Sequence, residues 1–330
     1  MPGAVKMPFL ILAVDIGGTS FRLALADERG RILRRGSGPT RPEEGPERLL
    51  RRIKTKVEGL LIDSGTRAMV KGVGVGAAGP LDLESGMLLH PPNLPGWHHV
   101  PLKSMLEESL GFPVWLRNDV DLGALGEHRF GAGRGFQQLI YLALGTGIGG
   151  GVILGGQLLS GTRVSAMEAG HMVVSPGGPR CNCGREGCLE ALASGTAIAR
   201  RAAERLSQGE RSQMLEMVNG KVERITAELV ARAAREGDAL ARQVLQEAGE
   251  WLGIGVVNLI LLFDPELVIV GGGVIGAGDF LLEPVRQAVK RWVVPYFERE
   301  VPVVRSRLGG DSNLVGAVAL ALDEISATTS

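Results

Sequence analysis

The stretch FLILAVDIGGTSFRLALAD, residues 9–27, decides the fold. Apolar residues run on both sides of Gly17 and Gly18, a pattern that predicts a strand, a glycine turn and a returning strand. Further along the chain, LIYLALGTGIGGGVILGG at residues 139–156 repeats this design, with its turn at residues 145–147. The chain is therefore predicted to be internally duplicated, with a β-hairpin at the start of each half.

Between and after the hairpins, the spacing of apolar residues alternates between helical and extended patterns. Helices are predicted over residues 44–64, 120–129, 194–206, 225–236, 239–263, 280–292 and 313–324. Further strands are predicted over residues 70–80, 113–116, 266–270 and 301–306. This alternation predicts an α/β fold, in which the hairpins make each sheet mixed rather than purely parallel.

The composition is that of a large folded enzyme. A chain of 330 residues favours two domains, or one large domain with a cleft. A hydrophobic fraction of 45% with 4% aromatic residues and 49 glycines is typical of aliphatic strands joined by tight turns. Thirty-six basic and thirty-six acidic residues give no net charge, so we expect no nucleic-acid partner.

Two apolar runs raise the question of a membrane or an export signal. MPFLILAV, at residues 7–14, continues directly into DIGGTS without a cleavage pattern, so it is interpreted as a strand. WLGIGVVNLILLF, at residues 251–263, is ended by Asp264 and Pro265, which leaves too few residues to cross a bilayer. Because no disulfide framework is present either, we expect a soluble, cytoplasmic protein without a membrane partner.

DIGGT, residues 15–19, has the features of a phosphate-binding turn. Adjacent glycines let backbone N–H groups face an anion, and Thr19 adds a hydroxyl donor. Asp15 stands at the end of the strand, where it could hold Mg²⁺ directly or through water. One such turn is equally typical of a plain structural hairpin. The second copy at residues 145–147 favours a pair of loops that bind a nucleotide's phosphates.

VGGGV, residues 270–274, follows a predicted strand and precedes a predicted helix. Bare backbone at this position would let a ligand approach closely. Its spacing is not G-x-G-x-x-G, so a dinucleotide-binding fold is the weaker interpretation.

Asn118 and Asp119 lie between a predicted strand and a predicted helix. Both residue types are good helix N-caps, and that role alone would explain them. The functional alternative is that Asp119 is a general base that takes a proton from a substrate hydroxyl as the oxygen attacks a γ-phosphate. Asn118 would then orient the same substrate.

EAGHMVVSPGGPRCNCGREGCLE, residues 168–190, contains every cysteine of the chain. Its cysteines and one histidine form a Cys₃His set typical of zinc, which we favour over free thiols or an iron–sulfur centre: His171, Cys181, Cys183 and Cys188. Four protein ligands leave no open position, so the ion is predicted to be structural. Glu168 and Glu190 flank the set, either as solvated surface residues or as partners for sugar hydroxyls.

The motifs DIGGT, RND, LALGTGIGGG, EAGH, CNCGREGCLE and VGGGV, in this order, resemble the ROK family of sugar kinases and sugar-responsive repressors. The resemblance covers residues 10–322 and is strongest toward bacterial ATP-dependent glucokinases. It implies an actin-like, hexokinase-like (ribonuclease H-like) fold of two α/β domains around a cleft. We expect a smaller domain of residues 1–117 plus 312–330, and a larger domain of residues 118–311 that carries the zinc loop.

The resemblance also implies roles for individual residues. The catalytic base is Asp119. The sugar-binding residues are Asn93, Asn118, Asp119, Glu168, His171 and Glu190. The nucleotide-binding residues are Asp15, Gly17, Gly18, Thr19, Gly145, Thr146, Gly147, Gly271, Gly272 and Gly273. The ligands of the structural zinc are His171, Cys181, Cys183 and Cys188.

The implied reaction transfers the γ-phosphate of magnesium-ATP to the 6-hydroxyl of glucose. N-acetylmannosamine, N-acetylglucosamine, fructose and mannose are alternative acceptors. Two departures from the family pattern bear on this choice: Ala78 replaces a proline of many family kinases, and Asp121 adds a negative charge beside the base. The family also implies a homodimer or homotetramer.

Two non-kinase alternatives remain. A repressor of the family would need a helix-turn-helix module ahead of the first hairpin, and the residues before Asp15 leave no room for one, so we expect none. A non-catalytic, sugar-responsive regulator of the same fold would bind sugar without releasing ADP.

Overall fold

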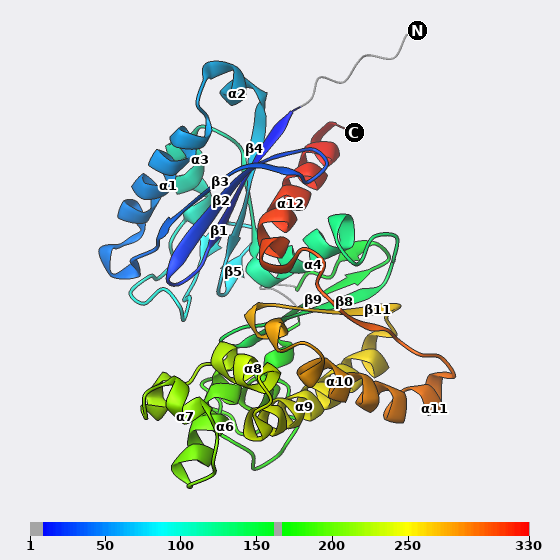
Figure 1. Cartoon of the computed structure of the whole chain (residues 1–330). Coiled ribbons are helices and arrows are strands. Elements are labelled where there is room, and N and C mark those ends of the chain that lie inside the picture. The colour runs from blue at the N-terminus through cyan, green and yellow to red at the C-terminus, as the bar shows by residue number, and fades with distance from the viewer. Residues whose placement is uncertain (1–8, 162–166, 330) are drawn as a thin grey trace. The chain divides into compact units, whose positions relative to one another are not determined.

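Two β-hairpins open the two large sheets of this protein (Figure 1). The computed structural model describes residues 9–161 and 167–329. β1 (Leu10–Ile16) pairs antiparallel with β2 (Ser20–Asp27), and β8 (Leu139–Leu144) pairs antiparallel with β9 (Ile148–Leu154). Both predicted hairpins are confirmed.

The two sheets repeat one strand order. The first sheet runs β3-β2-β1-β4-β7 and the second runs β10-β9-β8-β11-β12, so in both the hairpin's first strand is central. β1 is parallel to β4, β4 to β7, β8 to β11 and β11 to β12. The remaining strands are β3 (Ile32–Pro39), β4 (Val70–Ala77), β5 (Leu81–Asp82), β6 (Met87–Leu88), β7 (Val114–Asn118), β10 (Gln157–Leu158), β11 (Leu267–Gly271) and β12 (Val303–Arg305). The predicted duplication and the mixed sheets are confirmed.

The predicted helices are present, alongside others that we did not predict. Those before the second hairpin are α1 (Pro46–Leu60), α2 (Ser64–Met69), α3 (Leu102–Leu110) and α4 (Asp119–Phe130). Those after it are α5 (Leu189–Ala193), α6 (Gly195–Ser207), α7 (Met214–Met217), α8 (Ala227–Arg235), α9 (Ala239–Phe263), α10 (Asp279–Trp292), α11 (Val294–Phe297) and α12 (Ser312–Thr329). The single helix predicted over residues 44–64 is wrong at its end, because Asp63 caps a separate helix by accepting from the Thr66 N–H.

The first sheet is covered by helices on both faces. β1 is buried along its whole length, and its alternate residues point to opposite faces. Leu12 and Val14 pack with apolar residues of α1 and α3, whereas Ile11 and Ala13 pack with those of α12. Figure 1 shows α1 and α3 on one side of this sheet and α12 on the other.

In the second half, α9 is the central helix and packs against α5, α6, α8 and α10. At 25 residues it is longer than the apolar run that we considered in the sequence, and by length and composition it could span a membrane. However, 61% of the relevant window is buried inside the protein. We interpret α9 as the core helix of this half. Buried core helices are often as long and as apolar as helices that span membranes.

The chain divides into two units. In its described part, unit 1 comprises residues 9–135, 158–161 and 311–329, and unit 2 comprises residues 136–157 and 167–310. The first boundary therefore follows Gly135, whereas we expected it after residue 117. The reason is that α4 packs closely against α12 and stays with the first sheet.

Candidate active site and metal centre

Strand register gathers predicted site residues of unit 1 at one edge of the first sheet. Asp15 on β1 is opposite Gly76 on β4, and the next residues of these strands align with Asn118, the last residue of β7. Asp119 follows directly as the first residue of α4. The carboxyl ends of parallel strands are where ligands bind in open α/β sheets, so this edge has the location of a site.

The first glycine turn is held by backbone bonds and by Thr40. Gly17 N–H donates to Ser20 O at 3.0 Å, and the Thr40 hydroxyl donates to Gly17 O at 2.6 Å. Gly18 lies against Asn93, since a β-carbon on Gly18 would stand 2.6 Å from the Asn93 carbonyl oxygen. The structure thus places Asn93, which the motif match assigned less securely, beside the predicted phosphate turn.

Asp15 is 7% exposed and is paired with a residue that we did not predict. Arg22 donates to Asp15 Oδ2 through Nε at 3.1 Å and Nη2 at 2.5 Å. The two residues are direct neighbours across the hairpin, so the register of β1 and β2 makes this pair. Alternation along the predicted strand offered a signal for Arg22, because it is a charge within an otherwise apolar run.

Asn118 is the N-cap of α4, which is the structural role that its residue type alone predicts. Its Oδ1 accepts from the Val120 N–H at 3.0 Å, and its Nδ2 donates to Gly79 O at 3.2 Å. These bonds fix the side chain and the start of the helix, which in turn places Asp119 at the helix N-terminus.

Asp119 has the electrostatics of a base tuned toward neutral pH. Burial, together with the negative charge of Asp15, raises the pKa of Asp119 to about 6. Backbone N–H groups at the helix start favour the carboxylate, but they are outweighed. The negative charge that raises the pKa of Asp119 is that of Asp15. Asp121, the residue that we expected to add this charge, is a buried residue of α4. A pKa in this range suits general-base catalysis.

The second glycine turn, in unit 2, is bonded to the start of α6. Gly195 N–H donates to Gly145 O at 2.9 Å, and the Thr196 hydroxyl donates to Thr146 O at 2.8 Å. Gly195 and Thr196 follow Ser194, the N-cap of α6. We did not predict these residues, although the S-G-T sequence carries the signal of a helix start.

Glu190 lies on the same turn. Its Oε2 accepts from the Ile148 N–H at 3.0 Å, and a β-carbon on Gly147 would come within 2.2 Å of that oxygen. A side chain at position 147 would therefore force the Glu190 carboxylate to move. Glu190 joins the predicted phosphate turn to the cysteine loop, since its Oε1 lies 3.8 Å from Cys181 Sγ.

The glycine triplet lies at the same edge of the second sheet. Gly271 ends β11 and is opposite Ala143 of β8, one residue before the strand ends. Gly272 has a φ of 89°, a conformation that side chains other than glycine rarely adopt, and Gly273 begins a 3₁₀ helix. The two glycine segments of unit 2 thus meet, as strands β8 and β11 are neighbours.

The four predicted zinc ligands form one cluster. The ligand atoms of His171, Cys181, Cys183 and Cys188 all lie within 4.8 Å of one another. His171 Nδ1 is 3.7 Å from Cys181 Sγ, and Cys183 Sγ is 3.7 Å from Cys188 Sγ. Two thiolates bound at about 2.3 Å in a tetrahedron lie about 3.8 Å apart, so the donor set and its spacing fit zinc. Because all four positions are filled by protein, the site fits a structural ion.

The predicted sugar-binding residue Glu168 is exposed. Glu168 precedes the 3₁₀ helix Ala169–His171, and its carbonyl accepts from the His171 N–H at 3.0 Å. Its side chain is exposed, as the surface interpretation of Glu168 requires. Two residues separate it from His171 of the cysteine cluster, so the same short segment carries both.

Known proteins are similar to this chain over nearly its whole length. A model of the ROK family matches residues 11–324. The glucokinase of Thermotoga maritima is 40% identical, over 97% of this chain and 99% of that protein. The glucokinase of Streptomyces coelicolor is 38% identical, over 94% of this chain and 97% of that protein.

A solved structure extends the match to the fold. A ROK family glucokinase from Streptomyces griseus, in complex with glucose and AMPPNP, is 39% identical and aligns with a TM-score of 0.83, over 95% of this chain and 99% of that one. The predicted actin-like, hexokinase-like fold class is confirmed. With the family model covering nearly its whole length and with relatives close to 40% identical, this chain belongs to the ROK family.

Proposed function

We propose that this protein is an ATP-dependent glucose kinase that phosphorylates the 6-hydroxyl of the sugar. The observation that carries the proposal is the environment of Asp119, a carboxylate at the sheet edge whose pKa is raised to about 6. Relatives over nearly the full chain are glucokinases, and the aligned structure from Streptomyces griseus contains glucose and an ATP analogue.

Asp119 is assigned as the general base. As the 6-oxygen of glucose attacks the γ-phosphorus, its proton passes to the Asp119 carboxylate, the bond to the β-γ bridging oxygen breaks, and ADP leaves. Asn118 is assigned to the same sugar. Its bonds to Val120 and Gly79 hold it in place, and Nδ2 has a second N–H to donate to a hydroxyl.

Asp15 is the residue that we assign to magnesium. A buried carboxylate at the end of β1 supplies the oxygen ligand that this ion prefers. Because Arg22 donates to Oδ2, we assign Oδ1 as the magnesium ligand. When bound, magnesium neutralises charge on the β- and γ-phosphates. The ATP-binding set is Asp15, Gly17, Gly18, Thr19, Gly145, Thr146, Gly147, Gly271, Gly272 and Gly273.

The sugar-binding set is proposed to be Asn93, Asn118, Asp119, Glu168, His171 and Glu190. Two of these residues keep an atom for the sugar while another atom is engaged. His171 places Nδ1 toward the cysteines, and Glu190 uses Oε2 for the Ile148 N–H. His171 Nε2 and Glu190 Oε1, the latter 3.8 Å from Cys181 Sγ, are the atoms assigned to hydroxyls. Structural zinc at the Cys₃His cluster would fix both residues.

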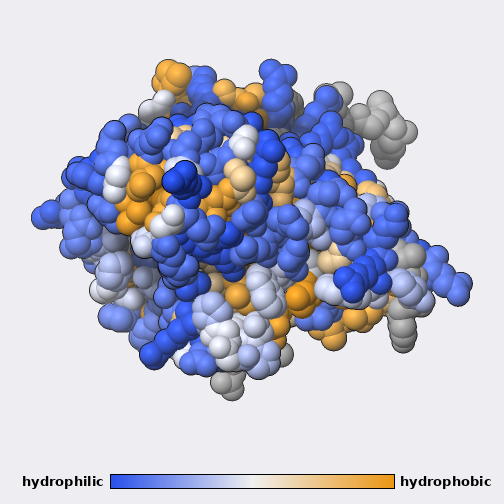
Figure 2. All heavy atoms as spheres, turned by 60° about the horizontal axis from the view of Figure 1, so that its bottom comes forward, coloured by the Kyte–Doolittle hydropathy of each residue, from blue (hydrophilic) through white to orange (hydrophobic). Residues whose placement is uncertain are grey.

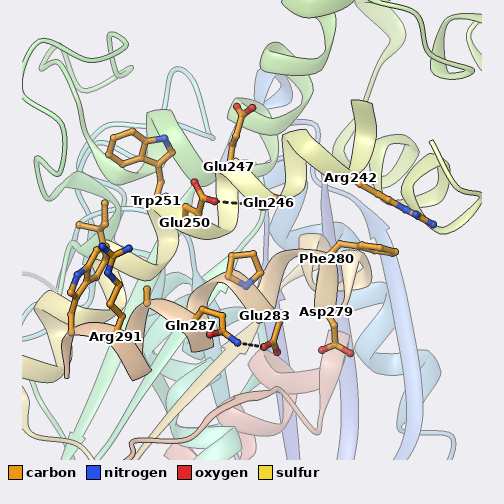
Figure 3. A pocket seen from close by; sticks show the side chains of 14 residues that line it. Arg242, Gln246, Glu247, Glu250, Trp251, Asp279, Phe280, Glu283, Gln287 and Arg291 are labelled. Atoms are coloured by element: carbon orange, nitrogen blue, oxygen red, sulfur yellow. Dashed lines mark hydrogen bonds between the residues drawn. The ribbon is translucent and has the colours of Figure 1, made fainter. Parts of the chain in front are cut away.

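We further propose a homodimer or homotetramer. A cavity of about 870 Å³ lies in unit 2 between α9 and α10 (Figure 3), and none of the predicted site residues is among the residues that line it. Trp251, Ile254, Phe280 and Trp292 contribute its apolar wall, and the side chain of Trp292 is 45% exposed. Figure 2 shows that hydrophobic side chains gather in a few patches on a largely hydrophilic face. Apolar surface of this kind is typical of subunit interfaces.

We propose a cytoplasmic location, without a membrane or nucleic-acid partner. The support is the balanced charge of the chain and the burial of α9 within unit 2.

The test is ADP release with magnesium-ATP over a panel of glucose, mannose, fructose, N-acetylmannosamine and N-acetylglucosamine. We expect glucose to give the highest kcat/KM. Turnover of an N-acetylhexosamine in preference to glucose would replace the substrate assignment but keep the kinase. Sugar binding without ADP release from any of the five would identify a non-catalytic regulator.

A further inference from the structure

Three of the five histidines of the chain lie in one loop, and none of the three has an assigned role. The loop joins β6 to α3 and has the sequence HPPNLPGWHH from His90 to His99. Leu88 and Val100 form a β-bridge at its base, with hydrogen bonds of 2.8 and 2.9 Å in both directions. The two ends of the loop, and the imidazoles on them, are therefore held together.

The imidazole rings contact one another. His90 Nδ1 lies 3.0 Å from His98 Nδ1. The His99 ring stands edge-on to that of His90, with 4.7 Å between the centroids. Two nitrogens at about 2.05 Å from one ion and about 90° apart are separated by about 2.9 Å, so the distance between these Nδ1 atoms is that of neighbouring ligands.

The loop is preorganised for such a role. Trp97 is 2% exposed and donates from Nε1 to Pro42 O at 3.1 Å, which anchors the segment just before His98. The His99 N–H donates to Leu89 O at 2.9 Å. His99 also has a φ of 50°, in the left-handed region that residues other than glycine adopt uncommonly. Three prolines limit the freedom of the intervening chain, so little conformational entropy remains to be lost when a ligand binds.

We propose that His90 and His98, with His99 beside them, form a second metal site, which binds a divalent transition ion of the nickel, copper or zinc class. Imidazole suits these ions, and nitrogen ligands at right angles favour Ni²⁺ and Cu²⁺. All three side chains are exposed, so the site is open to ions from solvent and to water as a further ligand. It is distinct from the cysteine cluster, which belongs to unit 2 and has its four ligands already.

A direct hydrogen bond is the alternative account of the short contact. One neutral imidazole can donate to another at 3.0 Å, and this arrangement needs no ion. The two accounts predict different results when the protein is titrated with a metal ion, because a hydrogen bond between His90 and His98 does not involve His99.

The test uses tag-free, full-length protein that carries one zinc per chain, titrated with Ni²⁺ by isothermal calorimetry at pH 7.5. We expect one nickel ion per chain, with binding weakened at least about tenfold in His90→Gln and in His98→Gln. His99→Gln is expected to weaken binding as well. His128→Gln replaces a histidine outside both sets and is the matched control, so it should bind nickel like the parent.

Two further measurements keep the outcome decisive. Thermal melting without nickel checks that each variant folds, and an added nickel excess should raise the melting temperature of the parent but not of His90→Gln. A zinc-sensitive dye reports whether nickel displaces zinc. Nickel binding that releases zinc, or that is as tight in His90→Gln and His98→Gln as in the parent, would overturn the proposal.

Discussion

The Glu190 carboxylate accepts a hydrogen bond from the backbone N–H of Ile148 at 3.0 Å. This bond joins the residue after the second glycine turn to the residue two positions beyond the last cysteine of the metal cluster. A single side chain therefore connects the segment assigned to phosphate with the segment assigned to zinc and sugar.

Glu190→Ala is expected to lower the folding stability and to weaken the binding of both substrates. The Ile148 N–H loses its acceptor, which costs about 1–3 kcal/mol of folding free energy, measurable by urea unfolding. The KM values for glucose and for ATP are both expected to rise. Glu190→Gln keeps an amide oxygen for the Ile148 N–H and serves as the control. An alanine variant with parental stability and parental KM values would contradict the assigned connection.

Asp119→Asn is expected to lower kcat by about 10²–10⁴-fold, because general-base catalysis contributes this much, while glucose affinity changes little. The parent should lose kcat/KM as pH falls through about 6, where the raised pKa places protonation of the base. A pH–rate profile from pH 5 to 8 and glucose binding by calorimetry check both points. A kcat no lower than that of the parent would remove Asp119 from the role of base.

The same pKa predicts the pH dependence of stability. Folding raises the pKa of Asp119 from 3.8 to about 6, so the folded protein binds the proton more tightly than the unfolded chain. The stabilisation from this group is present below the unfolded pKa and is lost as pH rises through about 6. Asp119→Asn should therefore melt at a higher temperature than the parent at pH 7.5, with a smaller difference at pH 4.5. A difference that does not depend on pH would contradict this account.

Cys181→Ser is expected to reduce both zinc content and sugar affinity. Cys181 is buried, and its sulfur lies near His171 Nδ1 and Glu190 Oε1, so loss of the ion should loosen both of these sugar-site residues. Metal analysis and glucose calorimetry are the measurements. Asn182→Ser changes the exposed residue next to Cys181 and should behave like the parent. If the zinc-free variant binds glucose with parental affinity, the metal loop is only a structural clamp.

Glu127→Ala is expected to destabilise unit 1 by about 2 kcal/mol or more, because the substitution removes the buried carboxylate that accepts two hydrogen bonds. Glu127 has no exposed surface and accepts from the Ala132 N–H at 2.8 Å and from the Ser312 hydroxyl at 3.0 Å. Urea unfolding provides the comparison. The exposed Glu108→Ala variant should stay within about 0.5 kcal/mol of the parent. Equal losses in the two variants would argue against a special role for Glu127.

The hairpins and the metal cluster were predictable because their determinants are close in sequence. Apolar runs around Gly17 and Gly18 specify strands with a turn, and the spacing of the cysteines matches one ion. The end of α1 was missed because Asp63 acts as an N-cap within a segment of helical spacing. The domain boundary was missed because it depends on the packing of α4 against α12, which the local pattern does not contain.

What the sequence by itself determined is the alternation of strands and helices, the two glycine turns, the ligand set of the metal cluster and the position of Asp119 at a helix start. Tertiary structure decided which side chains surround these features. Arg22 meets Asp15 through the register of the hairpin, Asn93 reaches Gly18 from a distant loop, and Glu190 covers Gly147. Turn and ligand patterns arise from neighbours along the chain, whereas the pKa of Asp119 arises from burial and from the charge of Asp15, 104 positions earlier in the sequence, which only the paired strands bring close.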